Sequence, residues 1–255
     1  MNKKKITVII QARTQSVRLP NKVLASIEDR SLIWYIIERL KNSKTLEQIV
    51  LAIPSRTEDR VLIKIAEDSN VSAFAGDEND VLERFYNAAL KFNADPIIRI
   101  TGDCPLVDPY LLDKMVEFYL ENNYDYVSNT IIPTYPDGLD IEVFSFDTLS
   151  KAFTEAKLKS EREHVTPFIL KNPTIFRLHN YENTEDQSKY RLCVDEQPDL
   201  DLIRRIYSKL KPKIIFPFKE VIRLIESNPE LLKINDQIKR NEGYLKSIRE
   251  DGDNK

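Results

Sequence analysis

Residues 6–24 read ITVIIQARTQSVRLPNKVL and combine an apolar run with a cationic loop. Its apolar start, residues 6–10, has the length and the β-branched side chains of a strand buried in a parallel sheet. A polar loop with three cations, Arg13, Arg18 and Lys22, follows directly. Because open α/β sheets bind ligands beyond the carboxyl ends of their strands, this loop predicts a bound polyphosphate. For any one of these residues, the alternative is a solvated basic loop.

Strands and helices alternate in the first half of the chain. Apolar runs predict strands at 48–53, 71–74 and 96–100. Amphipathic patterns predict helices at 32–44, from a Ser55–Glu58 capping box to Ser69, at 77–92, and from Asp108 and Pro109 to Glu121. This order predicts a parallel sheet with helices on both faces.

The pattern is looser after residue 125, where a Pro- and Tyr-containing loop occupies 130–138. We expect strands at 126–128, 140–144, 175–179 and 190–194. We expect helices from Asp147 to Lys157, from Ser160, from Pro198, and in the tail from Phe218, interrupted at Asn228-Pro229. The simplest account is one domain with an insertion-like middle.

Composition excludes several classes of protein. The 38 Lys and Arg against 41 Asp and Glu give a net charge of -3, so nothing global indicates a nucleic-acid partner. No apolar run is long enough to span a bilayer, and the N-terminus lacks the apolar core of a signal peptide. We therefore expect a cytoplasmic protein with no membrane partner.

Two aspartates lie where metal ligands are expected. Asp103 follows the fourth strand, and Asp195 follows the predicted strand at 190–194. If these strands run parallel to the first, both carboxylates face the polyphosphate, a normal arrangement for Mg²⁺. The alternative role for each is a turn or a helix cap. Cys104 and Cys193 sit beside them and are expected to be buried packing residues.

The loop motif Gln11-Ala-Arg-x-x-Ser-x-Arg-Leu-Pro-x-Lys22 is joined by further stretches along the chain. They are GDENDVLERF (76–85), RITGDCPLVDP (99–109), YVSN (126–129), YPDGLDIEVF (135–144), SEREHVTPFI (160–169), VDEQPDL (194–200) and NEGYL (241–245). As a set they resemble the sugar-acid cytidylyltransferases, the family of the CMP-Kdo and CMP-sialic acid synthetases. The closer match is to the SpsF-like branch of spore-coat polysaccharide biosynthesis.

This resemblance implies a three-layer α/β/α fold with a mainly parallel mixed sheet, like that of the nucleotide-diphosphosugar transferases. It implies a single nucleotidyltransferase domain, 1–255, in which 130–190 forms the acceptor pocket and a dimer contact and 218–255 a helical tail. The implied enzyme takes CTP and a small acidic sugar, needs Mg²⁺, releases pyrophosphate and forms a homodimer.

The resemblance also assigns roles to individual residues. Arg13, Lys22 and Asp103 are the expected catalytic residues, and Asp103 and Asp195 the expected metal ligands. The expected nucleotide-binding residues are Gln11, Ala12, Arg13, Ser16, Arg18, Lys22, Asp80, Arg84, Thr101 and Asp103. The expected acceptor-binding residues are Tyr135, Asp137, Asp140, Glu142, Arg162, Glu163 and His164.

The loop departs from the family pattern at two positions where relatives usually carry glycine, Gln15 and Asn21. Asn21 can adopt a positive φ at modest cost, whereas Gln15 does so less easily.

Two other functions fit the fold. A glycosyltransferase would normally carry a D-x-D metal motif after a mid-sheet strand, but this chain has such motifs only at Asp199 and Asp251. A non-catalytic nucleotide-binding module would bind Mg²⁺ and CTP without turnover.

Overall fold

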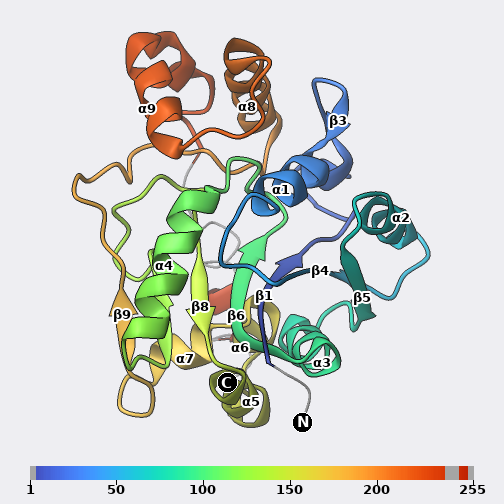
Figure 1. The fold of residues 1–255 in the computed structure, drawn as a ribbon. Helices are drawn as coiled ribbons and strands as arrows, with labels where there is room; N and C mark the ends of the chain where they lie inside the picture. Colours follow the sequence, from blue (N-terminus) through green and yellow to red (C-terminus); the bar gives the residue numbers. More distant parts are fainter. Residues whose placement is uncertain (1–3, 239–246, 252–255) are drawn as a thin grey trace.

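A seven-stranded sheet forms the centre of the molecule, in the order β5-β4-β1-β6-β8-β7-β9 (Figure 1). The computed structural model describes residues 4–238 and 247–251, so the NEGYL stretch lies outside the described residues. The strands are β1 (Lys5–Gln11), β4 (Gln48–Pro54), β5 (Ser72–Gly76), β6 (Ala94–Thr101), β7 (Tyr126–Ser128), β8 (Glu142–Phe144) and β9 (Leu178–Asn180). The neighbours β5-β4-β1-β6 are parallel, β8 runs antiparallel to both β6 and β7, and β9 is parallel to β7. The predicted mainly parallel mixed sheet is therefore confirmed.

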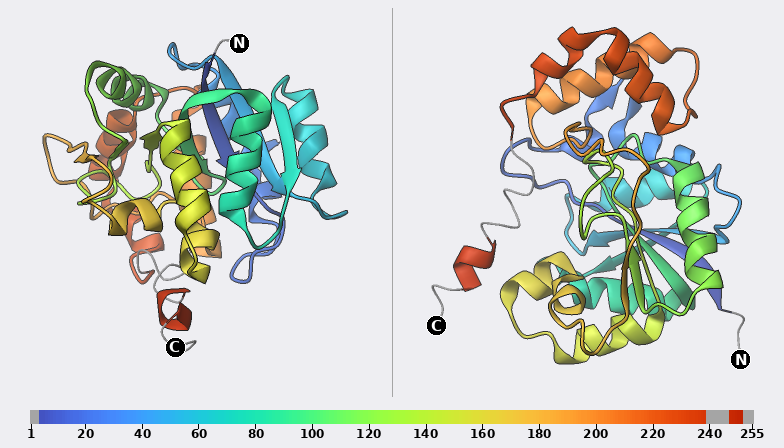
Figure 2. Two further views of the ribbon diagram at one scale, coloured as in Figure 1. Left: turned by 90° about the horizontal axis from the view of Figure 1, so that it is seen from below. Right: turned by 90° about the vertical axis from the view of Figure 1, so that its left-hand side faces the viewer.

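Helices cover both faces of this sheet (Figure 2). They are α1 (Leu32–Leu40), α2 (Arg60–Asp68), α3 (Val81–Phe92), α4 (Pro109–Glu121), α5 (Phe146–Glu155), α6 (Lys159–His164), α7 (Pro167–Lys171), α8 (Gln197–Leu210) and α9 (Phe218–Ser227). Short elements are the hairpin β2 (Ser26–Ile27) and β3 (Arg30–Ser31) and the 3₁₀ helices η1 (Lys22–Leu24) and η2 (Pro229–Ile234).

The side chains of β1 alternate between two cores, because successive residues of a strand face opposite sides. Val8 and Ile10 pack in the larger core with α1, α2, α4, α8 and α9. Ile9 packs in the second core with α3, α5 and α7. Burial on both faces explains why this strand is a continuous apolar run.

Arg39 on α1 is fully buried and fastens two loops to each other. Its guanidinium donates hydrogen bonds to the backbone oxygens of Val107 (2.8 Å), Ile214 (2.7 Å) and Phe216 (2.8 Å). It also lies over the Phe216 ring, 4.4 Å from the centroid. The loop that follows β6 is therefore tied to the segment that precedes α9.

Several local predictions were wrong. The strand expected at 175–179 is β9 at 178–180, the helix expected from residue 77 begins at Val81, and the helix expected to run to residue 44 ends at Leu40.

Three further differences concern a helix start, a helix cap and a missing strand. The helix predicted from Ser55 begins at Arg60, because residues 55–59 form turns instead. Asp59 precedes the helix, but its carboxylate bonds to Thr14 and Arg56 and does not cap it. Ser145, rather than Asp147, caps α5, since its hydroxyl accepts the Thr148 N–H at 3.0 Å. Residues 190–194 form no strand of the sheet and make only an isolated bridge between Arg191 and Asp137.

Candidate active site

The loops after β1 and β6 are in direct backbone contact at the carboxyl edge of the sheet. The Gly102 N–H donates to the Gln11 carbonyl oxygen at 2.8 Å. A Cβ on Gly102 would lie only 2.8 Å from that oxygen and 3.0 Å from the Ala12 Cβ, so glycine is required for this approach. As a result, the cationic loop and Asp103 lie beside each other.

Asp59, a fully buried residue between β4 and α2, fixes the cationic loop through hydrogen bonds to Thr14. Its carboxylate accepts the Thr14 N–H (2.7 Å), the Thr14 hydroxyl (2.9 Å) and two N–H groups of Arg56 (2.8 and 2.6 Å). Asn21 closes the loop with φ 58°, the left-handed conformation expected for it. Gln15 is exposed and its φ is not positive, so the loop does not need glycine there.

Lys22 joins the two aspartates that were predicted as metal ligands. Its Nζ donates to Asp103 Oδ2 at 2.8 Å, to Asp195 Oδ1 at 2.8 Å and to the Val194 carbonyl oxygen at 3.0 Å. The two carboxylates therefore converge on the ammonium of Lys22, although no strand precedes Asp195.

The charges of this cluster stabilise one another. Burial disfavours the charged form of Asp103, but attraction and hydrogen bonding to Lys22 outweigh it and lower the pKa of the Asp103 carboxyl to about 2. Burial also disfavours the charged Lys22, but the two aspartates outweigh it and raise the pKa of the ammonium above its ordinary value. Both groups are therefore ionised at neutral pH.

Backbone hydrogen bonds, rather than a β-ladder, position the segment that carries Asp195. The Leu192 N–H donates to the Asp137 oxygen at 2.7 Å, and the Val194 N–H donates to the Asp103 oxygen at 2.8 Å. Gly138, with φ +99°, leaves room for this segment, since a Cβ there would lie 2.5 Å from the Cys193 nitrogen.

Arg191 is a site residue that the sequence reasoning missed. Its side chain, 9% exposed, binds Asp195 Oδ2 (2.9 Å), Asp137 (2.9 Å) and Asp199 (3.0 Å). Arg18 binds the other oxygen of Asp195 at 3.0 Å. An arginine flanked by apolar Tyr190 and Leu192 was the available signal, because a cation in an apolar segment is usually paired.

Arg84 and Arg13, both predicted to bind the nucleotide, form a second cationic group. Burial, followed by repulsion from Arg13, lowers the pKa of Arg84 to about 10. Its guanidinium donates to the Asp77 carbonyl oxygen at 2.5 Å, but its Nε has no hydrogen-bond partner among the described residues. Two neighbouring cations, one of them incompletely satisfied, favour an anion at this place.

Asp80 and Arg162, predicted for nucleotide and acceptor respectively, are paired with each other. Arg162 Nε donates to Asp80 Oδ2 at 2.8 Å, while Asp80 Oδ1 caps α3 by accepting the Glu83 N–H at 2.8 Å. This ion pair fixes α6 to the start of α3.

Glu142 on β8 lies at the centre of a buried polar network. It is 5% exposed and forms an ion pair with Arg99, and its Oε1 accepts the hydroxyls of Tyr126 (2.5 Å) and Thr166 (2.6 Å). Arg99 also donates to Gln11 Oε1 at 3.0 Å. The network links the end of β1 to the α6–α7 turn.

That turn is strained at Val165, whose φ of 73° and ψ of -56° are rare for a β-branched residue. The Thr166 N–H donates to the His164 oxygen at 2.9 Å, which closes a γ-turn. His164 Nε2 lies 3.0 Å from the Ser247 hydroxyl, and that hydroxyl donates to Glu163 at 3.1 Å. The C-terminal segment 247–251 thus packs on α6.

The other predicted residues differ in burial and contacts. Ala12 is buried, Ser16 is half-buried, and the Thr101 hydroxyl lies 3.2 Å from Cys104 Sγ. Tyr135 is buried against Phe218. Burial, followed by Asp103 and Asp140, raises the pKa of the Cys104 thiol well above its ordinary value, in line with a packing role.

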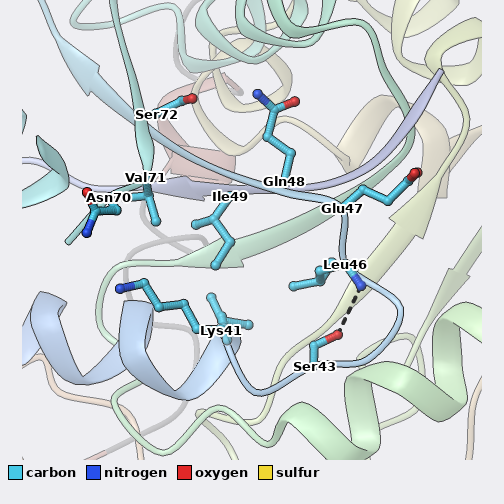
Figure 3. A pocket seen from close by; sticks show the side chains of 10 residues that line it. Lys41, Ser43, Leu46, Glu47, Gln48, Ile49, Asn70, Val71 and Ser72 are labelled. Carbon is cyan, nitrogen blue, oxygen red and sulfur yellow. Dashed lines mark hydrogen bonds between the residues drawn. The ribbon is translucent and has the colours of Figure 1, made fainter. Parts of the chain in front are cut away.

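Within residues 4–238 and 247–251, no group of three or more His, Cys, Asp or Glu side chains is arranged to hold a metal ion. No helix of this described part is long and apolar enough to cross a membrane. A cavity of about 300 Å³ lies at the opposite edge of the sheet, between the end of α1 and the starts of β4 and β5 (Figure 3). Lys41, Gln48 and Asn70 are among its lining residues. It is therefore separate from the site around Lys22.

Residues 7–228 match the family model described as cytidylyltransferase. The chain belongs to the cytidylyltransferase family. An uncharacterized protein of Methanocaldococcus jannaschii is 42% identical over 96% of this chain and 98% of its own length. The spore coat polysaccharide biosynthesis protein SpsF of Bacillus subtilis is 32% identical over 88% of this chain and 95% of its own length. This cytidylyltransferase is thus similar to the SpsF branch along nearly its whole length, as its motifs predicted.

A 3-deoxy-manno-octulosonate cytidylyltransferase of Chloroherpeton thalassium is 32% identical over 46% of this chain and 47% of its own length. Among solved structures, a cytidylyltransferase of Leptospira borgpetersenii superimposes with a TM-score of 0.87 and 35% identity, covering 90% of this chain and 97% of the other. These comparisons confirm the predicted family and the nucleotidyltransferase fold, and the chain is a CTP-dependent nucleotidyltransferase.

Proposed function

We propose that this enzyme transfers a cytidylyl group from CTP to an acidic sugar or a related acceptor, in the biosynthesis of a surface polysaccharide. One observation carries the proposal: two cations of the loop, Lys22 and Arg18, contact the carboxylates that were predicted as metal ligands, Lys22 both of them and Arg18 Asp195. In a cytidylyltransferase, carboxylates and cations that meet at this edge suit a metal-bound triphosphate. The likeness to SpsF and to sugar-acid cytidylyltransferases supports the acceptor class.

In the proposed reaction, an acceptor oxygen attacks the α-phosphorus of CTP in line. The new acceptor–phosphorus bond forms as the bond to the β-phosphate oxygen breaks, and pyrophosphate leaves with the electron pair. Such transfers are catalysed mainly by positioning and by neutralising phosphate charge. Arg13 and Lys22 would offset the charge that develops on the leaving pyrophosphate, and Arg18 would be a second clamp.

Asp103 and Asp195 fit a magnesium ion, because Mg²⁺ prefers hard oxygen ligands and shares them with substrate phosphates. Two protein carboxylates would leave the remaining coordination positions of the ion for phosphate oxygens and water. The bound metal would polarise the α-phosphate. Asp195 is held by Arg191, so its carboxylate stays in place when a ligand arrives.

The acceptor would lie against the turn between α6 and α7. There the predicted residues Glu142, Arg162 and His164 are engaged in contacts within the chain. We assign them to shaping this pocket together with Tyr135, Asp137, Asp140 and Glu163. We also propose that the enzyme is cytoplasmic and that residues 1–255 form one domain. We further propose that it is a homodimer, which light scattering of the purified chain would test.

The direct test is pyrophosphate release from CTP and Mg²⁺ with a panel of ulosonic acids and sugar phosphates, with UTP and ATP as controls. We expect release with CTP and at least one acidic sugar. Asp103→Asn should lower turnover by about 100-fold or more without unfolding the protein. Asp68→Asn, on the exposed face of α2, is the matched control and should leave turnover unchanged. No CTP binding by calorimetry and no turnover with any acceptor would refute the proposal.

A further inference from the structure

Lys22 occupies the position between the two candidate metal ligands. Its ammonium donates to one oxygen of Asp103, one oxygen of Asp195 and the Val194 carbonyl, at 2.8, 2.8 and 3.0 Å. These three contacts use all three of its N–H donors. Two carboxylates and a carbonyl are the same kinds of oxygen that bind a hard divalent cation. The Lys22 ammonium therefore occupies the position that a divalent cation would take between these oxygens.

Asp195 is already paired with three cations, which it shares with neighbouring carboxylates. Lys22 and Arg18 both contact its Oδ1, at 2.8 and 3.0 Å, and Arg191 contacts its Oδ2 at 2.9 Å. A divalent cation arriving alone would meet these three positive groups at short range. Both oxygens of Asp195 are therefore occupied, and a free metal ion must displace at least one of these cations to bind there.

We propose that Lys22 is a resident cation that excludes free divalent metal, and that the triphosphate of the nucleotide draws it away so that metal and nucleotide bind together. This inference rests on the proposed function. The phosphates offer the ammonium new anionic partners and bring the negative charge that a metal ion needs. By linkage, the factor by which CTP strengthens metal binding equals the factor by which the metal strengthens CTP binding.

The surroundings allow Lys22 to move while the carboxylates stay. Its side chain is 14% exposed and has a flexible four-carbon stem that begins on the short helix η1. The backbones of the two acidic segments stay joined through the Val194 N–H and the Asp103 oxygen, 2.8 Å apart. The Lys22 ammonium can therefore leave the two aspartates for a nearby anionic acceptor without a change of fold.

The test measures Mn²⁺ binding by the loss of the free-ion EPR signal, with and without CTP, so that it does not depend on turnover. A protein-free titration of Mn²⁺ with CTP gives the baseline, because CTP itself chelates Mn²⁺, and only the additional loss counts as binding to the protein. Wild type should bind Mn²⁺ weakly alone and about 5- to 150-fold more tightly with CTP, the usual range of such couplings. Lys22→Met should gain affinity for Mn²⁺ in the absence of CTP by a factor in the same range. Lys22→Arg keeps the charge, so its affinity for Mn²⁺ in the absence of CTP should not increase. Asp103→Asn in the Lys22→Met background should abolish the gain and so locate the ion.

Two results would overturn the inference. One is wild type that binds Mn²⁺ equally well with and without CTP, a comparison that requires no variant. The other is a folded Lys22→Met, checked by circular dichroism, whose affinity for Mn²⁺ alone equals that of wild type. In either case, retained pyrophosphate release would leave the proposed function standing. Loss of CTP binding by wild type would instead remove the proposed function.

Discussion

Glu142→Gln removes the charge at the centre of the buried network and keeps the size of the side chain. Glu142 is 5% exposed and is paired with Arg99, whose side chain is 12% exposed. Removing one partner of a buried ion pair costs about 3–5 kcal/mol, because the other charge stays buried. Glutamine keeps an oxygen for the hydroxyls of Tyr126 and Thr166, so we expect a loss at the lower end, about 3 kcal/mol. Urea unfolding followed by the fluorescence of Trp34 measures it.

A double-mutant cycle separates the ion pair from other effects. Arg99→Met in the Glu142→Gln background removes the orphaned charge, so the double variant should be more stable than the sum of the two single changes predicts. Asp68→Asn, in an ion pair whose side chains are 65–73% exposed, should change stability by at most about 0.5 kcal/mol. A Glu142→Gln loss below about 1 kcal/mol, or additive single changes, would refute the network as a coupled unit.

Asp59→Asn weakens the support of Thr14, so calorimetry should show the Kd for CTP raised about tenfold, and an unchanged Kd would count against this role. Asn21→Ala should lower the free energy of unfolding by about 1 kcal/mol because φ is positive there, whereas Asn21→Gly should not; equal melting temperatures would contradict this. The pKa of Asp103 is lowered from 3.8 to about 2. Between these values the unfolded chain binds more protons than the folded chain, so the free energy of unfolding decreases as the pH is lowered. Lys22→Met should reduce this acid loss, as unfolding curves at pH 5 and 2.5 can show, and an unchanged loss would disprove the attribution.

The parallel half of the fold was predictable from sequence because its signals are local. Each buried strand is an apolar run, and Asp108 with Pro109 marks the start of α4, where the Asp108 carboxylate accepts the Tyr110 N–H at 2.8 Å. Residues 190–194 have the same strand-like composition but form no ladder. Their hydrogen-bond partners lie on the distant loops at Asp137 and Asp103, which the composition of a segment does not encode.

The candidate site was predictable where neighbouring strands bring loops together. Parallel strands end at one edge, so the cationic loop and Asp103 were expected at the same edge, and they lie there. The direct contact between Lys22 and Asp103 was not predicted. Arg191 was missed because its three partners come from separate positions in the chain. The contacts of Glu142 within the chain were likewise hidden, because sequence shows the type of a residue but not what it faces.

The buried Arg39 gives the molecule two parts that respond differently to salt. Its partners are neutral carbonyl groups inside the protein, so added ions do not screen this clamp. The contact between Arg18 and Asp195 involves two full charges on side chains that are 34% and 20% exposed, and is screened. Raising the ionic strength should therefore loosen the cationic loop, while the loops joined by Arg39 keep their positions.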